Sequence, residues 1–160
     1  MSGREGFVER FGAVYEDSPW VAEAVWPGAG ALRTPELMAA AMAAVVDSAS
    51  RERKLALIRA HPQLAGRARM ADASVREQAG AGLDQCSPEE YAAFHRLNAA
   101  YDDRFGFPFI VAVKGMSRRD ILDTFEARLG NTPETEFDEA VRQIHRIAAF
   151  RLADLFREPA

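Results

Sequence analysis

Helical sequence signals occupy almost the whole chain, and only one segment has the composition of a β-strand. That segment, Phe107 to Val113, is a short apolar run that contains β-branched residues. A strand must pair with another strand, and we find no second candidate in the sequence. We therefore interpret this run as a buried extended segment, and we predict an all-α fold.

Predicted helix starts recur where a serine or threonine precedes a proline, because the hydroxyl can cap a helix and proline suits its first turn. These starts are Ser18-Pro19, Thr34-Pro35, Ser87-Pro88 and Thr132-Pro133. Further helices are predicted near Phe7 to Tyr15, at Ser50 to Arg59, from Ser74 to Gly80 and after Ser117, and the last from Pro133 to Phe156. Trp26 to Gly30 is expected to be a loop. Together they predict a single domain, residues 1–160, folded as a bundle of about eight helices.

Composition limits the class of partner. The net charge is −4 and no dense Lys/Arg stripe is present, which argues against a nucleic-acid partner. No segment reaches the roughly 18 apolar residues that span a bilayer, so no membrane partner is expected. The single cysteine, Cys86, cannot form an internal disulfide, and it has no obvious base beside it. A reducing, cytoplasmic location is the expectation.

His61 is the first candidate for chemistry, since it alone of the three histidines lies in a predicted loop. Proline follows it, and a residue before proline is disfavoured in a helix, so we expect a turn or extended backbone at a helix exit. Its ordinary pKa near 6.5 suits a general acid/base, and a helix C-cap is the structural alternative. His95 and His145 are expected to face solvent. No histidine or cysteine spacing predicts a metal site.

Ser74, Glu77 and Gln78 begin the next predicted helix. Ser74 and Glu77 have the spacing of a capping box, which is a purely structural interpretation. A glutamate in a first turn is also favoured in its ionised form by the helix dipole, so Glu77 could hold an imidazolium or accept a substrate N–H. Gln78 offers both a donor and an acceptor, which suits an amide or ureide group.

The extended segment and one arginine complete the candidate site. A segment without a partner strand has main-chain groups that need partners, which a polar ring or other loops and water could supply. Arg151 falls on the apolar stripe of the last helix, so it needs either an internal ion pair or an anionic or carbonyl group of a substrate. Asn98 lies beside the stripe of its own helix, and we expect it to bridge to a loop.

These clusters, in this order, resemble the OHCU decarboxylases of urate degradation. OHCU is 2-oxo-4-hydroxy-4-carboxy-5-ureidoimidazoline. The matching stretches are Tyr15 to Ala22, His61 to Ala65, Ser74 to Leu83, Asn98 to Tyr101, Phe105 to Val113, Arg128-Leu129 with Asn131, and Ile147-Ala148 with Arg151-Leu152. The sequence departs from the family pattern between Trp26 and Arg33, where an Arg-Pro-Phe motif is absent.

The resemblance implies an all-α bundle, a homodimer as in several members, no cofactor, and a small ureide substrate that loses CO2 to give (S)-allantoin. It implies that His61 is the catalytic acid/base, and we assign Glu77 a supporting catalytic role. The substrate-binding residues that it implies are Pro62, Ser74, Gln78, Phe109, Ile110, Val111, Ala112, Val113 and Arg151. Two other functions stay open from the residues alone: a non-catalytic ureide-binding module, and a hydrolase of a neighbouring ureide.

Overall fold

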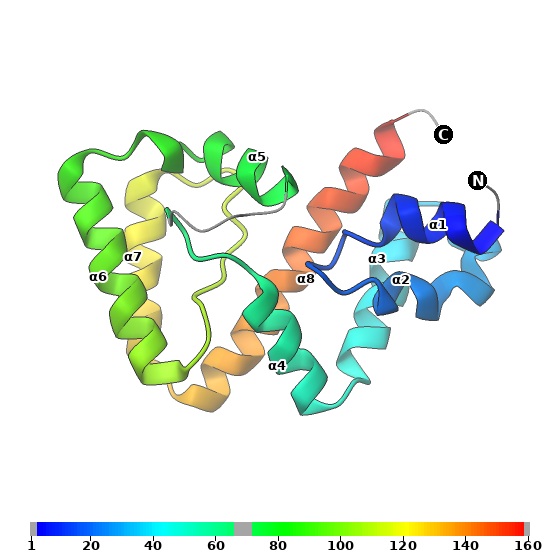
Figure 1. The fold of residues 1–160 in the computed structure, drawn as a ribbon, viewed down its shortest axis with the longest axis horizontal. Coiled ribbons are helices and arrows are strands. Elements are labelled where there is room, and N and C mark those ends of the chain that lie inside the picture. Colours follow the sequence, from blue (N-terminus) through cyan, green and yellow to red (C-terminus); the bar gives the residue numbers. More distant parts are fainter. Residues whose placement is uncertain (1–2, 66–71, 159–160) are drawn as a thin grey trace. The chain divides into compact units, whose positions relative to one another are not determined.

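A computed structural model describes residues 3–65 and 72–158, and all regular structure within those ranges is helical (Figure 1). The α-helices are α1 (Gly3–Phe11), α2 (Trp20–Val25), α3 (Pro35–Asp47), α4 (Arg51–Ala60), α5 (Asp72–Gly80), α6 (Pro88–Phe105), α7 (Arg118–Leu129) and α8 (Pro133–Arg157). Two 3-10 helices, η1 (Trp26–Ala31) and η2 (Leu83–Gln85), join them. The prediction of an all-α fold is confirmed.

The chain divides into two compact units, which we describe separately. The first unit comprises Met1–Ala60 with Ile144–Ala160, and the second comprises His61–Gln143. Helix α8 contributes residues to both units.

The first unit has a core of large aliphatic and aromatic side chains from α1 to α4 and α8. Its largest fully buried side chains are Tyr15, Met38, Met42, Leu57, Ile58 and Ile144. The predicted cap of α3 is confirmed, because the Thr34 hydroxyl accepts a hydrogen bond from the Leu37 N–H at 3.1 Å. Local sequence thus sets where α3 begins, and the apolar stripe sets which face is buried.

Two local predictions in the first unit are wrong. Ser18 does not cap α2, because its hydroxyl donates to the Glu16 carbonyl at 2.8 Å instead, and Pro19 takes the N-cap position. Serine hydroxyls readily form such short-range bonds to the main chain, which compete with capping. The predicted loop at Trp26 to Gly30 is a 3-10 helix, η1, with proline in its first turn.

The second unit packs α6 against α7 around an aromatic cluster. Tyr101, Phe109 and Phe125 lie at its centre, with the rings of Phe109 and Phe125 stacked at 3.9 Å between centroids. Both helices start as predicted, since Ser87 and Ser117 each form a complete capping box. The run from Phe107 to Val113 is neither helical nor strand, as the sequence predicted, and all of it except the half-buried Pro108 is buried.

The start of α5 differs from the prediction. The helix begins at Asp72, so Ser74 is its third residue and not its N-cap. The capping-box interpretation of Ser74 and Glu77 is therefore wrong. In the part of the chain that the structure describes, no helix is both long and apolar enough to cross a bilayer.

Candidate active site

His61 lies immediately after the last residue of α4, where the chain leaves the helix. Its side chain is 7% exposed, and the backbone there is bent, as predicted for a residue before proline. Pro62 follows with part of its surface exposed. A helix end thus holds a buried imidazole beside a short non-helical loop.

Gln78 holds that loop through hydrogen bonds to both the oxygen and the nitrogen of its side-chain amide. Its Oε1 accepts from the Ala65 N–H at 3.0 Å, and its Nε2 donates to the Gln63 carbonyl at 3.2 Å. Ala65 has a φ of 54°, a left-handed conformation that non-glycine residues rarely adopt. Two bonds from one amide help to hold this strained turn.

Asn98, on α6, binds the same loop. The prediction that Asn98 bridges to a loop is confirmed. Its Nδ2 donates to the Leu64 carbonyl at 2.9 Å, in a buried setting. Its Oδ1 is also buried and has no hydrogen-bond partner within residues 3–65 and 72–158. The loop after His61 is therefore held by two amide side chains, one from α5 and one from α6.

Helix α5 brings the three predicted residues of its segment to neighbouring positions. Ser74 and Gln78 are four residues apart and both are buried, so they lie on the same face of the helix. Glu77 is three residues after Ser74 and partly exposed. The three residues therefore lie on the predicted helix, although this helix starts earlier than predicted.

The extended segment is held by two side chains, Arg128 and Gln143, that were not among the predicted site residues. The Arg128 guanidinium donates from Nη1 to the Ile110 carbonyl, and its centre lies 4.5 Å from the centre of the Phe109 ring. The Ala112 N–H donates to Oε1 of Gln143 at 3.0 Å. Helices α7 and α8 thus satisfy alternate main-chain groups of the segment.

Arg128 is itself part of a buried ion pair. Its Nε donates to Oε1 of Glu136 at 2.9 Å, and the hydroxyl of Tyr101 donates to the same oxygen at 2.5 Å. Asn131 donates to the other carboxylate oxygen at 2.9 Å. Burial, and then the hydrogen bond to Glu136, raise the pKa of Tyr101 well above its ordinary value, so this hydroxyl remains a donor.

Arg151 belongs to the first unit and points inward, as its place on the apolar stripe predicted. Its side chain is 7% exposed and pairs with the Glu16 carboxylate at 2.9 Å. Its Nη1 also faces the carbonyls of Ala13 and Val14, both at 3.3 Å. The internal ion pair that the sequence left as an alternative is therefore present.

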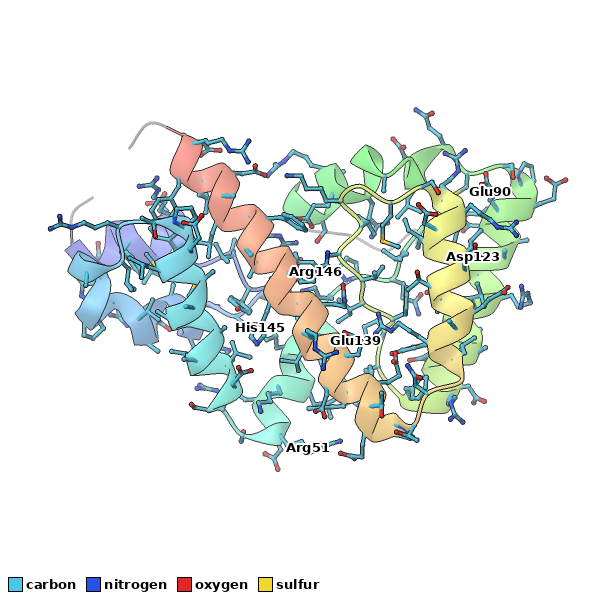
Figure 2. The ribbon with its side chains drawn as sticks, turned by 180° about the vertical axis from the view of Figure 1, so that it is seen from behind. Arg51, Glu90, Asp123, Glu139, His145 and Arg146 are labelled. Atoms are coloured by element: carbon cyan, nitrogen blue, oxygen red, sulfur yellow. The ribbon has the colours of Figure 1, made fainter. Side chains whose placement is uncertain are left out.

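His145 contradicts the expectation that it faces solvent. Its Nδ1 lies 2.7 Å from the Tyr15 hydroxyl, and its Nε2 lies 2.9 Å from a carboxylate oxygen of Asp47. Figure 2 labels His145 on α8. Burial, with the Asp47 charge as a smaller cause, raises the pKa of Tyr15 well above its ordinary value. The exposed position of His95 is as predicted.

Neither a metal centre nor an activated thiol is visible in the residues that the structure describes. No group of three or more His, Cys, Asp or Glu side chains there is arranged to hold a metal ion. Burial, and then the charge of Glu90, raise the pKa of the Cys86 thiol, which lowers its thiolate fraction.

Comparison with known proteins places this architecture in one family. The sequence model described as OHCU decarboxylase matches residues 2–153. The chain is 46% identical over 152 residues to the 2-oxo-4-hydroxy-4-carboxy-5-ureidoimidazoline decarboxylase of Haloferax volcanii, covering 95% of this chain and 90% of the relative. The enzyme of the same name from Halalkalicoccus jeotgali is 43% identical over 155 residues, covering 97% and 88%.

A solved structure gives the same result for the fold. The crystal structure of (S)-allantoin synthase superposes with a TM-score of 0.78 at 34% identity and covers 96% of this chain. The chain spans 51%, about half, of the length of that protein.

Proposed function

This chain belongs to the OHCU decarboxylase family, and on that premise we propose that it converts 2-oxo-4-hydroxy-4-carboxy-5-ureidoimidazoline to (S)-allantoin in urate degradation. The observation that carries the proposal is the family match over residues 2–153, which includes every candidate site residue from His61 to Arg151. As a decarboxylase the protein is a carboxy-lyase.

The proposed chemistry needs one carbon–carbon bond to break and one proton to be delivered. The bond between the ring and its carboxylate breaks, CO2 leaves, and the electron pair passes into the C=N system of the ring. This delocalisation makes a metal or organic cofactor unnecessary to the proposed reaction. The enzyme must orient the carboxylate and bring a proton to one face of the ring, and both tasks lower the barrier.

We assign the proton transfer to His61, because a buried imidazole at a helix exit can exchange a proton near neutral pH. Glu77 orients the imidazole or binds the ureido N–H groups. The contacts that fasten the loop support a positioning role for Gln78 in addition to its predicted contact with substrate. The other proposed substrate-binding residues are Pro62, Ser74, Phe109, Ile110, Val111, Ala112 and Val113.

Arg151 is proposed to bind a carbonyl oxygen of the substrate or the charge that develops as CO2 departs. A tight pair with the departing carboxylate would stabilise the ground state and slow the reaction. Its ion pair with Glu16 holds the Arg151 guanidinium in one position, which supports a contact with substrate. The same ion pair is also consistent with a role in stabilising the fold alone. Arg151→Lys separates these: a lower kcat supports the transition-state contact, whereas a higher KM at unchanged kcat contradicts it.

The test of the activity is a coupled assay. Urate oxidase and hydroxyisourate hydrolase generate the unstable substrate in place, and circular dichroism follows (S)-allantoin. Wild type and the control His95→Ala, which changes an exposed histidine, should form the S enantiomer rapidly. His61→Ala should give only the slow racemic background. Background rates with the wild type would contradict the decarboxylase, and full activity of His61→Ala would contradict the role of His61.

The remaining proposals concern assembly and location. We propose that residues 1–160 work as one domain, that the protein is a cytoplasmic homodimer, and that neither nucleic acid nor membrane is a partner. Light scattering after size-exclusion chromatography tests the dimer. Twice the chain mass of 17.6 kDa is expected, and a mass of 17.6 kDa would contradict the proposal.

A further inference from the structure

We propose that Gln143 and Arg128 are positioning residues that determine which main-chain groups of Phe109 to Val113 face the substrate. The inference rests on the proposed function, in which this segment binds the substrate. Neither side chain is proposed to touch the substrate. Each acts through one main-chain group of the segment, and both groups are identified by their hydrogen bonds.

The first step is the geometry of the segment. The chain runs from Pro108 to Val113 without a turn or bend. We infer a strand-like extended conformation for this stretch, in which the N–H and C=O of one residue point to one side and those of the next residue point to the other. Ile110 and Ala112 are two residues apart, so their main-chain groups share a side. Those are the two residues that Arg128 and Gln143 bind.

The second step is what remains on the other side. The main chain of Val111 points away from the side that Arg128 and Gln143 occupy, because it is the residue between the two that they bind. Within residues 3–65 and 72–158, no hydrogen bond joins the N–H or C=O of Val111 to another residue. Val111 as a whole is 7% exposed. Its main-chain donor and acceptor are thus open to a partner, and a ring with carbonyl and N–H groups supplies both.

The third step is the orientation of the Gln143 amide. Its Nε2 lies 3.4 Å from Oε2 of Glu139, one helical turn earlier on α8, so its oxygen is the atom directed at Ala112. Glu139 is in turn paired with Arg142 at 3.0 Å. The carboxylate therefore selects the amide orientation that accepts a hydrogen bond from the segment. With the opposite orientation, an NH2 group would face the Ala112 N–H.

Rotation of the segment would exchange the two sides. If the Ala112 N–H lost its acceptor, the peptide groups could rotate about their flanking φ and ψ angles, and the groups that Val111 presents would change direction. The two side chains prevent this exchange, since each binds only a group of one type: Arg128 can only donate, and the Gln143 oxygen can only accept. This pairing also fixes the direction of the donor and acceptor that Val111 presents.

The test uses Gln143→Met, which keeps the side-chain length and removes the acceptor. Arg146→Met, which changes an exposed arginine of the same helix, is the matched control. We expect KM of the coupled reaction to rise about tenfold in Gln143→Met with kcat within threefold, and both to be unchanged in the control. A role limited to packing would reduce thermal stability without changing KM.

A second readout does not depend on activity. Hydrogen exchange of the Ala112 amide, followed by NMR, should be at least tenfold faster in Gln143→Met than in the wild type or in Arg146→Met. The exchanged pair Glu139→Gln with Gln143→Glu keeps an oxygen for the Ala112 N–H and an amide beside it, and should restore both protection and KM. If Gln143→Met does not fold, Gln143→Asn takes the place of that variant in both measurements. Its side chain is one methylene shorter, which moves the accepting oxygen away from the Ala112 N–H.

The outcomes separate the two proposals. A wild type without turnover would refute the function, while the exchange rates would still decide whether Gln143 holds Ala112. If hydrogen exchange of the Ala112 amide is unchanged in Gln143→Met, the inference is overturned. Faster hydrogen exchange with an unchanged KM would also overturn it. The expected result is a KM that is raised in Gln143→Met and returns to the wild-type value in the exchanged pair. Protection of the Ala112 amide should be lost and regained in the same two variants.

Discussion

The buried pair of Arg128 and Glu136 permits a stability prediction for Glu136→Gln. Glu136 is 0% exposed, and its two oxygens accept hydrogen bonds from Arg128, Tyr101 and Asn131. An amide has the same shape but only one accepting oxygen, so at least one of these donors would face an NH2 group. Arg128 would also lose its counter-charge in a buried position. Removing one partner of such a pair typically costs about 3–5 kcal/mol, so we expect a loss of that size in the free energy of unfolding.

The assay is urea denaturation followed by far-ultraviolet circular dichroism at pH 7. The matched control is Glu126→Gln on α7, whose carboxylate is 61% exposed and lies 3.9 Å from Arg96, and it should change the free energy of unfolding by less than about 0.5 kcal/mol. The double variant Arg128→Met with Glu136→Gln should lose less than the sum of the two single variants, because no uncompensated charge stays buried. A loss below about 1 kcal/mol for Glu136→Gln, or additive losses, would refute this account.

Two further predictions concern other polar contacts. Tyr15→Phe removes the hydroxyl that bonds to His145 and should lower the free energy of unfolding by about 1 kcal/mol; an unchanged urea midpoint would contradict a stabilising bond. The hydrogen bond from the Ser87 N–H, and then that from Arg118, hold the pKa of Glu90 below its ordinary value, so this carboxylate contributes stability that is present above the ordinary glutamate pKa of about 4.3 and is lost as the pH falls through the lowered folded value. Arg118→Met should therefore flatten the acid limb of a plot of stability against pH, and an identical limb would contradict this.

Signals within a few residues of one another were enough to predict most of the helices. Thr34, Ser87 and Ser117 cap the helices that they were predicted to cap, since a cap depends only on the next three residues. Ser18 had the same local signal, but the Glu16 carbonyl takes its hydroxyl. At Ser74 the capping pattern was present, and the helix nevertheless begins two residues earlier.

Partners distant in sequence were beyond such reasoning. His145 was expected in solvent because it lies off the densest apolar positions of its helix, yet Tyr15 and Asp47 bind both of its ring nitrogens. Gln143 was missed because nothing local links it to Ala112, which lies 31 residues earlier. The inward direction of Arg151 was predictable from helical periodicity, whereas its partner Glu16 was not.

The loop after His61 has an attachment that does not titrate. Gln78 and Asn98 hold it through amides, which neither gain nor lose a proton in the range where proteins stay folded. These anchors are therefore the same at pH 5 and at pH 9. The limbs of a plot of reaction rate against pH can accordingly be assigned to ionisable groups, without a contribution from release of these amide anchors.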